Sequence, residues 1–395
     1  MSQPRFSPLN GISVVDLTSS LAGPTCTQIL AALGADVVKV EHPQRGDEAR
    51  AWGPRFFDGG SVMFFAANAS KRSLALDVKT PEGIEALHRL ADRADVFVQS
   101  MRPGTTERLG LGASVLRARN ERLVYCSIGA FGWRGPLAQQ PGYDPLMQAF
   151  TGLVSITGES DRPGVRVGTS LIDSGTGVWA ALGIVAALLE RSQTGLGREV
   201  DVSLFETGLS LVAYQLTDAL RSGIAPGRYG TAFPLIAPYE VFPTQDGELM
   251  IAAANDGLFA RFCEGLGLPE LVDDPRFRTN PDRLANRDAL LPPIRARLAE
   301  RPSAYWLEAL DGVPVALVQD LAQAATHEQT HAVGIVQELA GLQTLALPLE
   351  IDAERVGYQH APPTLGAQSA EVLAELGYSD AEIDALAAAG VTRLA

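Results

Sequence analysis

The chain has 395 residues and a formal net charge of −14, with 46% hydrophobic and 20% charged residues. These values indicate an ordinary folded protein, and the acidic balance argues against a nucleic-acid-binding protein, which needs a basic face. Three cysteines form neither a disulfide framework nor a metal-binding pair, which suits a reducing compartment. Residues 1–10 lack the apolar core of a signal peptide, and the apolar run 178–189 is shorter than the about 20 residues that cross a bilayer. We therefore expect a cytoplasmic protein without a membrane or nucleic-acid partner.

The first 130 residues alternate between β-branched runs and helical patterns. Strands are predicted at 12–17, 36–41, 73–77, 95–99 and 122–128, and helices at 22–35 and 80–94. This alternation predicts βαβ units, and so an α/β protein with a parallel sheet. Because ligands of such sheets bind at the carboxyl ends of strands, we expect the site in the turns after Leu17, Glu41 and Gln99.

The pattern of predicted elements changes twice in the rest of the chain. Helices are predicted at 142–151 and 174–191, and a strand at 200–204 leads into a further helix. From Pro226 onward, glycines and prolines separate short elements, which predicts a smaller second domain at residues 225–325. From residue 330 the chain returns to mixed strands and helices.

The segment 327–331 reads His-Glu-Gln-Thr-His and matches a zinc-hydrolase motif. On one helix, His327 and His331 could share a zinc ion, with Glu328 as general base and Glu350 as a third ligand. The alternative is a solvated helix end with two surface histidines. We expect the alternative, and therefore no metal site and no resident cofactor.

Basic residues stand near the predicted strand ends of this acidic chain. Lys71, Arg72, Arg102 and Arg108 could hold several phosphates of one ligand through charge-assisted hydrogen bonds, or they could be scattered surface charges. The turn at 18–24 joins the first strand to a helix, whose first N–H groups could hold an anion.

Asp173 stands directly before a long apolar helix and between the glycines at 168 and 175. This pattern predicts a helix N-cap. It is also compatible with a nucleophile, because a carboxylate at a helix N-terminus is expected to be ionised well below neutral pH and then needs no base.

Many ordered segments together resemble the family III CoA-transferases, which include formyl-CoA transferase, carnitine CoA-transferase and α-methylacyl-CoA racemase. The resemblance runs from about residue 9 to residue 378. The segments that carry it are 14–18, 22–24, 33–41, 71–73, 77–83, 94–96, Gly-Tyr-Asp at 142–144, the stretch around Asp173, 194–197, 255–256, 273–277 and 286–287.

The resemblance implies a Rossmann-like large domain built from residues 1–220 and 330–395, a smaller α+β domain between them, and an interlocked homodimer. It also implies that coenzyme A (CoA) is a substrate that lies along the large domain. The positions that match CoA-binding residues are Ser19, Ser20, Ala22, His42, Lys71, Ser100, Met101, Arg108 and Tyr143. An arginine is common in the family where His42 stands.

Asp173 matches the catalytic aspartate of the family. The implied mechanism is covalent: the carboxylate attacks the acyl-CoA carbonyl, and the released CoA thiolate attacks the aspartyl carbonyl of the resulting anhydride. The enzyme then carries CoA as an aspartyl thioester, which the acceptor carboxylate attacks in turn. We expect CoA transfer from succinyl-CoA or a similar donor to a short carboxylic or dicarboxylic acid.

Two further positions are expected to contact the substrate. Arg166 could pair with the distal carboxylate of a dicarboxylic acid, or form a structural ion pair. Asn255 lies in the segment 252–256, which replaces the glycine-rich loop of formyl-CoA transferase and argues against oxalate as the substrate. In the racemase branch a histidine stands where this chain has Tyr143, so a racemase or epimerase is the alternative activity.

Overall fold

The computed structural model describes residues 6–57 and 60–395, so the first five residues of the stretch considered as a signal peptide lie outside it. The chain divides into two compact units. The first unit contains Met1–Leu153, Val167–Leu220 and Gln329–Ala395, and the second contains Val154–Arg166 and Arg221–Glu328. Asp173 therefore belongs to the first unit, whereas Arg166 and Asn255 belong to the second.

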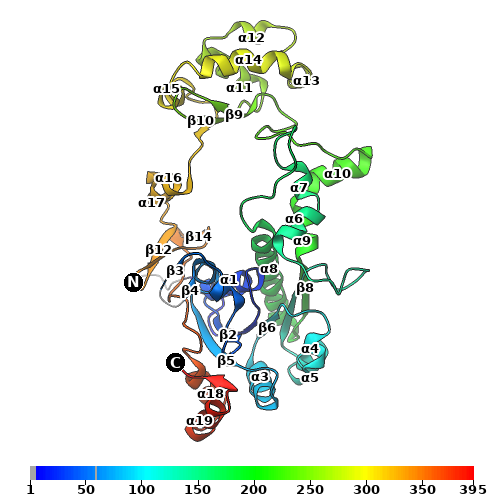
Figure 1. The fold of residues 1–395 in the computed structure, drawn as a ribbon, viewed down its shortest axis with the longest axis vertical. Coiled ribbons are helices and arrows are strands. Elements are labelled where there is room, and N and C mark those ends of the chain that lie inside the picture. The colour runs from blue at the N-terminus through cyan, green and yellow to red at the C-terminus, as the bar shows by residue number, and fades with distance from the viewer. Residues whose placement is uncertain (1–5, 58–59) are drawn as a thin grey trace. The chain divides into compact units, whose positions relative to one another are not determined.

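A seven-stranded sheet forms the centre of the first unit (Figure 1). Its order is β16 (Thr392–Arg393), β5 (Lys71–Leu76), β2 (Asp36–Glu41), β1 (Ser13–Leu17), β6 (Val96–Gln99), β7 (Val124–Gly129) and β8 (Glu199–Ser203). All strands are parallel except β16, which pairs antiparallel with β5. Counted along the chain, the six parallel strands have the order 3-2-1-4-5-6 of a doubly wound sheet. The predicted α/β class and parallel sheet are confirmed.

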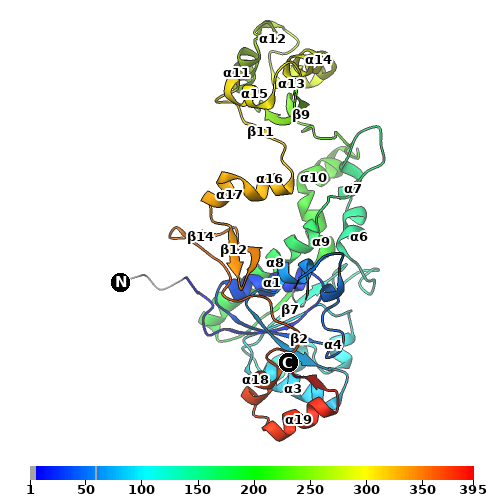
Figure 2. The same ribbon diagram turned by 60° about the vertical axis from the view of Figure 1, so that its left-hand side comes forward.

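Helices cover both faces of this sheet (Figure 2). On one face, α1 (Ala22–Ala32) and α8 (Leu171–Thr194) share a core with Val14, and on the other face α3 (Pro81–Arg93), α18 (Ser369–Glu375) and α19 (Asp380–Ala388) share a core with Val15. Successive residues of a strand point to opposite faces, so the adjacent valines serve the two cores. Both chain ends thus contribute to one layered structure.

The other elements of the first unit are short. They are η1 (Glu48–Ala51), β3 (Phe56–Phe57), β4 (Gly60–Ser61), α2 (Val62–Ala67), α4 (Thr105–Arg108), α5 (Ala113–Arg119), α6 (Asp144–Phe150), α9 (Leu204–Leu211), and the hairpins β12 (Val336–Leu339) with β13 (Leu342–Leu345) and β14 (Glu350–Ile351) with β15 (Glu354–Arg355). Three helices cross from one unit to the other: α7 (Leu153–Ile156), α10 (Ala213–Ser222) and α17 (Glu328–Ala332).

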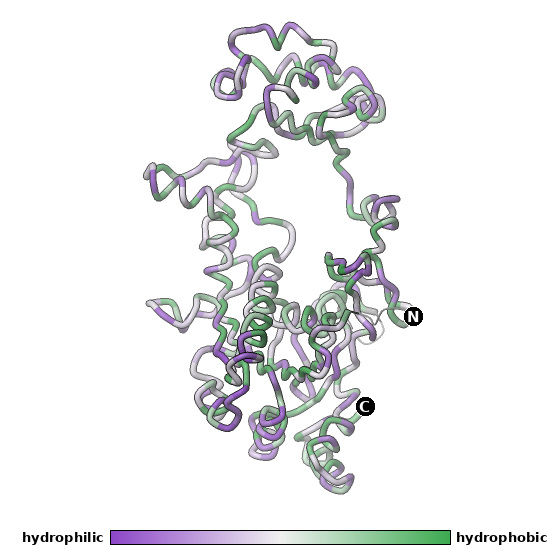
Figure 3. Tube along the Cα trace, turned by 180° about the vertical axis from the view of Figure 1, so that it is seen from behind, coloured by the Kyte–Doolittle hydropathy of each residue, from purple (hydrophilic) through white to green (hydrophobic). Residues whose placement is uncertain are grey.

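The long helix α8 is the one helix of the described chain that is long and apolar enough to cross a bilayer, by length and composition alone. It is longer than the predicted helix at 174–191, because it begins with the apolar pair Leu171 and Ile172 and continues through the polar residues 190–194 to Gly195, which has the left-handed conformation of a helix end. Hydrophobic residues lie along it and along the sheet (Figure 3), and Ala180, Ala181 and Ile184 are buried against the α1 side of the core. At Gly177 a Cβ atom would lie 2.8 Å from the carbonyl oxygen of Ala22, so the glycine permits the close approach of α8 to α1.

The second unit combines a three-stranded antiparallel sheet with short helices. The sheet has the order β11 (Val315–Leu317), β10 (Glu248–Ala252) and β9 (Tyr239–Pro243), and the helices are α11 (Asp256–Leu266), α12 (Glu270–Asp273), α13 (Asn280–Ala285), α14 (Arg287–Leu298), α15 (Ser303–Ala309) and α16 (Leu321–Thr326). Arg283 is fully buried and donates hydrogen bonds to the carbonyl oxygens of Ala237 (2.8 Å) and Phe277 (3.1 Å) and to Asp256 Oδ1 (2.7 Å). These bonds fix the chain at the start of α11.

Candidate active site at the carboxyl edge of the sheet

Two cavities lie at the carboxyl edge of the large sheet. One, of about 270 Å³, is formed by the turns after β1, β6 and β7 and by the start of α8. The other, of about 220 Å³, is formed by the ends of β1, β2, β5 and β6. Because Ser19, Ser100 and Met101 line both cavities, we treat them as one feature, the edge groove. The groove crosses between β1 and β6, where the strand order reverses and where ligands of doubly wound sheets bind.

The first cavity brings together residues from seven segments of the chain. Its lining residues are Ser19, Ser20, Ala22, Gly23, Glu48, Ser100, Met101, Arg102, Pro103, Ile128, Gly129, Ala130, Gln140, Pro141, Gly142, Tyr143, Asp173 and Leu204. This list includes seven of the residues that match functional positions of the family: Ser19, Ser20, Ala22, Ser100, Met101, Tyr143 and Asp173. An eighth, His42, lines the second cavity at the end of β2.

The turn between β1 and α1 has a fixed shape because buried carboxylates hold its N–H groups. Asp16 accepts the N–H of Thr18 (3.0 Å), and Asp47 accepts the N–H of Ser20 (3.0 Å), whose φ is +69°. The Ser20 hydroxyl donates to Glu48. At Gly23 a Cβ atom would lie 2.3 Å from Cβ of Thr18, so this position excludes a side chain. The first residues of α1 therefore line the groove without obstruction.

Lys71 does not line the groove, contrary to its predicted contact with CoA. Its side chain is fully buried, and Nζ lies 3.0 Å from Asp16 Oδ2, 2.8 Å from Asn68 Oδ1 and 3.0 Å from the carbonyl oxygen of Pro24. Burial lowers the pKa of Lys71 to about 8, although Asp16 favours its charged form. Three acceptors occupy all three donors of an ammonium group, so Lys71 supports the β1–α1 turn from behind instead of binding a phosphate.

Arg108 also lies outside the lining of both cavities. Its side chain is exposed on α4, where it donates to Thr105 Oγ1 (3.1 Å), and the neighbouring Arg102 lines the first cavity instead. Arg72 pairs with Asp36, Glu371 and Glu375 away from the groove. Of the basic cluster expected from the sequence, the structure thus brings Arg102 alone to the lining of the groove.

Asp173 is the third residue of α8 and not its N-cap, which corrects the sequence-based prediction. Ser170 occupies the N-cap position, and its side chain makes no capping hydrogen bond. The buried Asp144 at the start of α6 takes that role: its Oδ2 accepts the N–H groups of Ile172 (2.7 Å) and Asp173 (3.2 Å). With a cap supplied by another helix, α8 begins two residues before Asp173.

The carboxyl group of Asp173 is not held ionised well below neutral pH, contrary to the sequence-based expectation. Burial is the first cause and the negative charge of Asp144 the second, and together they raise the pKa of Asp173 to about 7. The helix N-terminus does not offset them, because Asp144 already occupies its N–H groups at residues 172 and 173. Asp173 is therefore about half ionised at pH 7.

The two predicted substrate residues both lie in the second unit. Arg166 is exposed, and Asn255 is the N-cap of α11, where its Oδ1 accepts the N–H of Leu258 (2.9 Å). The contacts predicted for these two side chains with the substrate stay predictions.

The sequence analysis missed Glu48 and Gln140 in the lining, and it missed the capping role of Asp144. Asp144 was noted only as part of Gly-Tyr-Asp, although an aspartate at a predicted helix start is a recognisable signal. Glu48 gave no such signal, because its place in the cavity depends on the fold of the segment after β2.

The zinc motif does not form a metal site. His327 has an extended backbone conformation after α16, and α17 begins at Glu328, so the two histidines do not lie on one helical turn. Over residues 6–57 and 60–395, no group of three His, Cys, Asp or Glu side chains could hold a metal ion.

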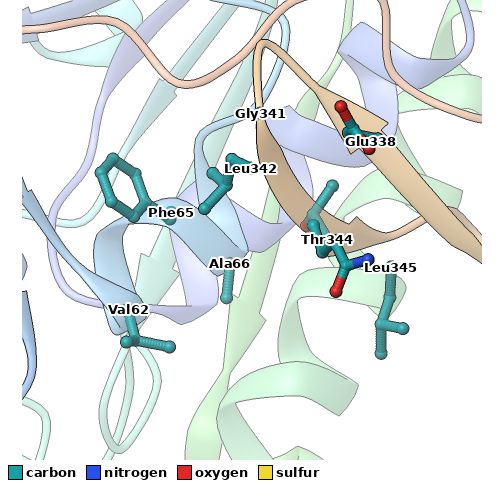
Figure 4. A pocket seen from close by; sticks show the side chains of 9 residues that line it. Val62, Phe65, Ala66, Glu338, Gly341, Leu342, Thr344 and Leu345 are labelled. Atoms are coloured by element: carbon teal, nitrogen blue, oxygen red, sulfur yellow. The ribbon is translucent and has the colours of Figure 1, made fainter. Parts of the chain in front are cut away.

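A larger cavity, of about 660 Å³, lies away from the edge groove. It is formed by Val62, Phe65 and Ala66 of α2 and by the β12–β13 hairpin, including Leu342 and Leu345 (Figure 4). Glu338 is the single ionisable residue of its lining. The other polar side chains of its lining are Gln343 and Thr344, and none of the residues predicted from the sequence lines it, so the edge groove is the candidate active site.

Comparison with known proteins identifies the family of the chain. The model of "CoA-transferase family III" matches residues 9–369. The chain is 36% identical over 394 residues to succinyl-CoA:glutarate CoA-transferase of Mus musculus, which covers 98% of this chain and 90% of that protein. It is 39% identical over 384 residues to acetyl-CoA:oxalate CoA-transferase of Acetobacter aceti, with 95% and 97% coverage.

A third relative and a solved structure agree with these matches. The chain is 38% identical over 332 residues to succinyl-CoA:mesaconate CoA-transferase of Haloarcula hispanica, with 82% and 83% coverage. The crystal structure of a CAIB/BAIF family protein from Brucella suis superimposes with a TM-score of 0.86 at 37% identity, over 94% of this chain and 100% of that chain.

Proposed function

This chain belongs to CoA-transferase family III and is a CoA-transferase, and we propose that it moves CoA from succinyl-CoA or a similar donor to a short dicarboxylic acid through an aspartyl thioester on Asp173. The observation that carries the proposal is the position of Asp173. This carboxyl group lines a cavity at the switch point of a doubly wound sheet, and its pKa of about 7 allows it both to attack and to leave at neutral pH.

The proposed reaction proceeds through two covalent forms of residue 173. The ionised carboxylate attacks the thioester carbonyl of the donor, the C–S bond breaks, and an acyl-aspartyl anhydride and the CoA thiolate result. The thiolate then attacks the aspartyl carbonyl and releases the donor acid, which leaves CoA bound to Asp173 as a thioester. Attack by the acceptor carboxylate and return of the thiolate reverse the two steps and give the new acyl-CoA.

The edge groove follows the carboxyl ends of β5, β2, β1, β6 and β7. We place the adenine end beside His42 in the second cavity and the thioester end beside Tyr143 and Asp173 in the first. Ser19 donates its N–H to Ser100 Oγ (3.2 Å), which joins the two strand ends under the middle of the groove. Arg102 is the cation of the lining and could pair with a phosphate or carboxylate.

The proposed acceptor class rests on the relatives. Glutarate, oxalate and mesaconate, named for three of them, are all dicarboxylic acids. Arg166 and Asn255 are the proposed contacts for the distal carboxylate, with Arg166 supplying a bidentate partner. The relative that acts on oxalate weakens the sequence argument against that acid, so oxalate belongs in the test.

We further propose that the active protein is an interlocked homodimer in the cytoplasm. The supporting observation is a set of large apolar side chains left exposed on α8 and α10, namely Val178, Trp179, Leu182, Leu189, Tyr214 and Leu220, each at least half exposed. A large set of exposed apolar side chains commonly marks a protein–protein interface.

An exchange assay tests the proposed function. The purified protein is incubated with succinyl-CoA or acetyl-CoA and a panel of free acids that includes glutarate, mesaconate and oxalate, and the new acyl-CoA is measured. We expect exchange with wild type and none with Asp173→Ala, whose circular dichroism should match wild type. Full exchange by the alanine variant would refute the role of Asp173, and deuterium incorporation at the α-carbon without an acceptor acid would favour the racemase alternative.

A further inference from the structure

Two side chains of α6 hold the segment that leads into α8. Asp144 accepts two backbone N–H groups at the start of α8, and its other oxygen, Oδ1, accepts the side-chain N–H of Gln148 (2.6 Å). Gln148 in turn accepts the N–H of Val167 (2.8 Å) and donates to the carbonyl oxygen of Thr169 (3.2 Å). Because these residues are one helical turn apart on α6, they act together, and we call the pair the α6 clamp.

The α6 clamp is buried and fully bonded. Asp144 is 1% exposed and Gln148 is 0% exposed, so neither side chain can exchange these bonds for water. Each oxygen of Asp144 has an N–H donor, as an ionised, acceptor-only carboxylate requires. Removing such a partner leaves buried N–H groups unsatisfied, which makes the position of Asp173 dependent on the clamp.

We infer that Asp144 is a positioning residue for the transferase reaction: it fixes the backbone of Asp173 at the cavity wall and keeps a second negative charge beside the nucleophile. This inference rests on the proposed function. It assigns a role to a residue that touches neither the donor nor the acceptor and acts through Asp173.

The charge of Asp144 affects the covalent steps through electrostatic repulsion. Two neighbouring carboxylates in a partly buried site repel each other, whereas an anhydride or a thioester at residue 173 carries no charge. Each acylation of Asp173 therefore relieves the repulsion, and the clamp favours the covalent forms. The other ionisable groups in the lining are Glu48 from η1, Arg102 after β6 and Tyr143 before α6, whereas α1 and the first residue of α9 contribute none.

A pH profile separates this role from a merely structural one. Wild type, with a pKa of about 7 at Asp173, should retain about one-tenth of its plateau kcat/KM at pH 6. Asp144→Asn removes the charge, but it turns one acceptor oxygen into an NH2 group, which cannot accept the N–H of Gln148. Without the charge, the acid limb should move to lower pH by about one unit, and the relative rate at pH 6 should rise about fivefold. The plateau kcat should fall, because the relief of repulsion is lost.

Gln148→Ala is the matched control, because it weakens the clamp but keeps the charge of Asp144. This variant should lose kcat and thermal stability without moving the acid limb to lower pH. Asp144→Ser, whose hydroxyl still accepts an N–H, takes the place of the asparagine variant if that one does not fold by circular dichroism. The inference is overturned if the acid limb of Asp144→Asn, or of Asp144→Ser in its place, coincides with that of wild type.

The parallel variant Asp173→Asn distinguishes the two possible failures. If it is inactive and Asp144→Asn keeps the wild-type limb, the inference fails and the proposed function stands. If Asp173→Asn retains exchange, the proposed function fails and the inference fails with it.

Discussion

Replacing Asp173 with asparagine should stabilise the protein while it removes activity. The carboxyl group ionises at about 3.8 in the unfolded chain and at about 7 in the folded one, so the folded state holds its proton over a wider pH range. The stability that this carboxyl group contributes to the wild type is therefore present below pH 4, and it is lost as the pH rises to 7. Above pH 7 the folded protein carries a buried charge that the variant lacks.

The magnitude follows from the difference between the two pKa values. At about 1.4 kcal/mol per tenfold change in the proton equilibrium, the free energies of unfolding of the variant and wild type differ by at most about 4 kcal/mol at pH 8. Because the cavity keeps the carboxyl in contact with water, we expect the Asp173→Asn variant to exceed wild type by about 2–4 kcal/mol in free energy of unfolding. The difference should be small at pH 4, grow up to pH 7 and then stay constant.

Urea unfolding of both proteins at several pH values and one protein concentration measures this difference. Asp384→Asn, which removes an exposed carboxylate from α19, serves as the matched control and should leave the free energy of unfolding close to wild type at every pH. The argument that the ionised Asp173 destabilises the fold is refuted if the difference in free energy of unfolding between wild type and Asp173→Asn does not change with pH. It is also refuted if the variant is less stable than wild type at pH 8.

Three further outcomes follow from the structure. Lys71→Met should cost about 3–5 kcal/mol of stability in denaturant unfolding, because it leaves Asp16 buried without its ion pair. The KM for acyl-CoA should stay near wild type. A rise in KM without a loss of stability would restore the role of Lys71 in binding CoA. Trp179→Glu should place a charge on the exposed apolar face of α8 and yield monomers in sedimentation; an oligomer like that of wild type contradicts the proposed interface. Dialysis against a chelator should leave exchange unchanged, and loss of exchange would revive a metal site at His327 and His331.

The sheet could be predicted from the sequence because local patterns determine it. Short β-branched runs, and Thr80 as the N-cap before Pro81, identified β1, β2, β6 and α3 to within about two residues. The antiparallel strand β16 was missed, because two residues at a chain end carry no period and gain their structure from pairing with β5.

The site was predictable where the resemblance supplied residues and less so where distant contacts decide. Asp173, Tyr143 and the β1–α1 turn meet in one cavity as expected. The environment of Asp173 depends on a carboxylate 29 positions earlier, and the burial of Lys71 depends on Asp16, 55 positions away. Contacts between residues so far apart in the sequence could not be predicted, because the fold determines which side chains meet across a sheet.

Reductive trapping tests the central role of Asp173 most directly. The protein is incubated with succinyl-CoA and then with borohydride, which reduces an aspartyl thioester to the alcohol, and peptide mass spectrometry locates the product. We expect homoserine at position 173 in wild type and none in Asp173→Asn. Wild-type protein that exchanges CoA but leaves residue 173 unreduced, or that carries the alcohol at another carboxylate, would contradict the account.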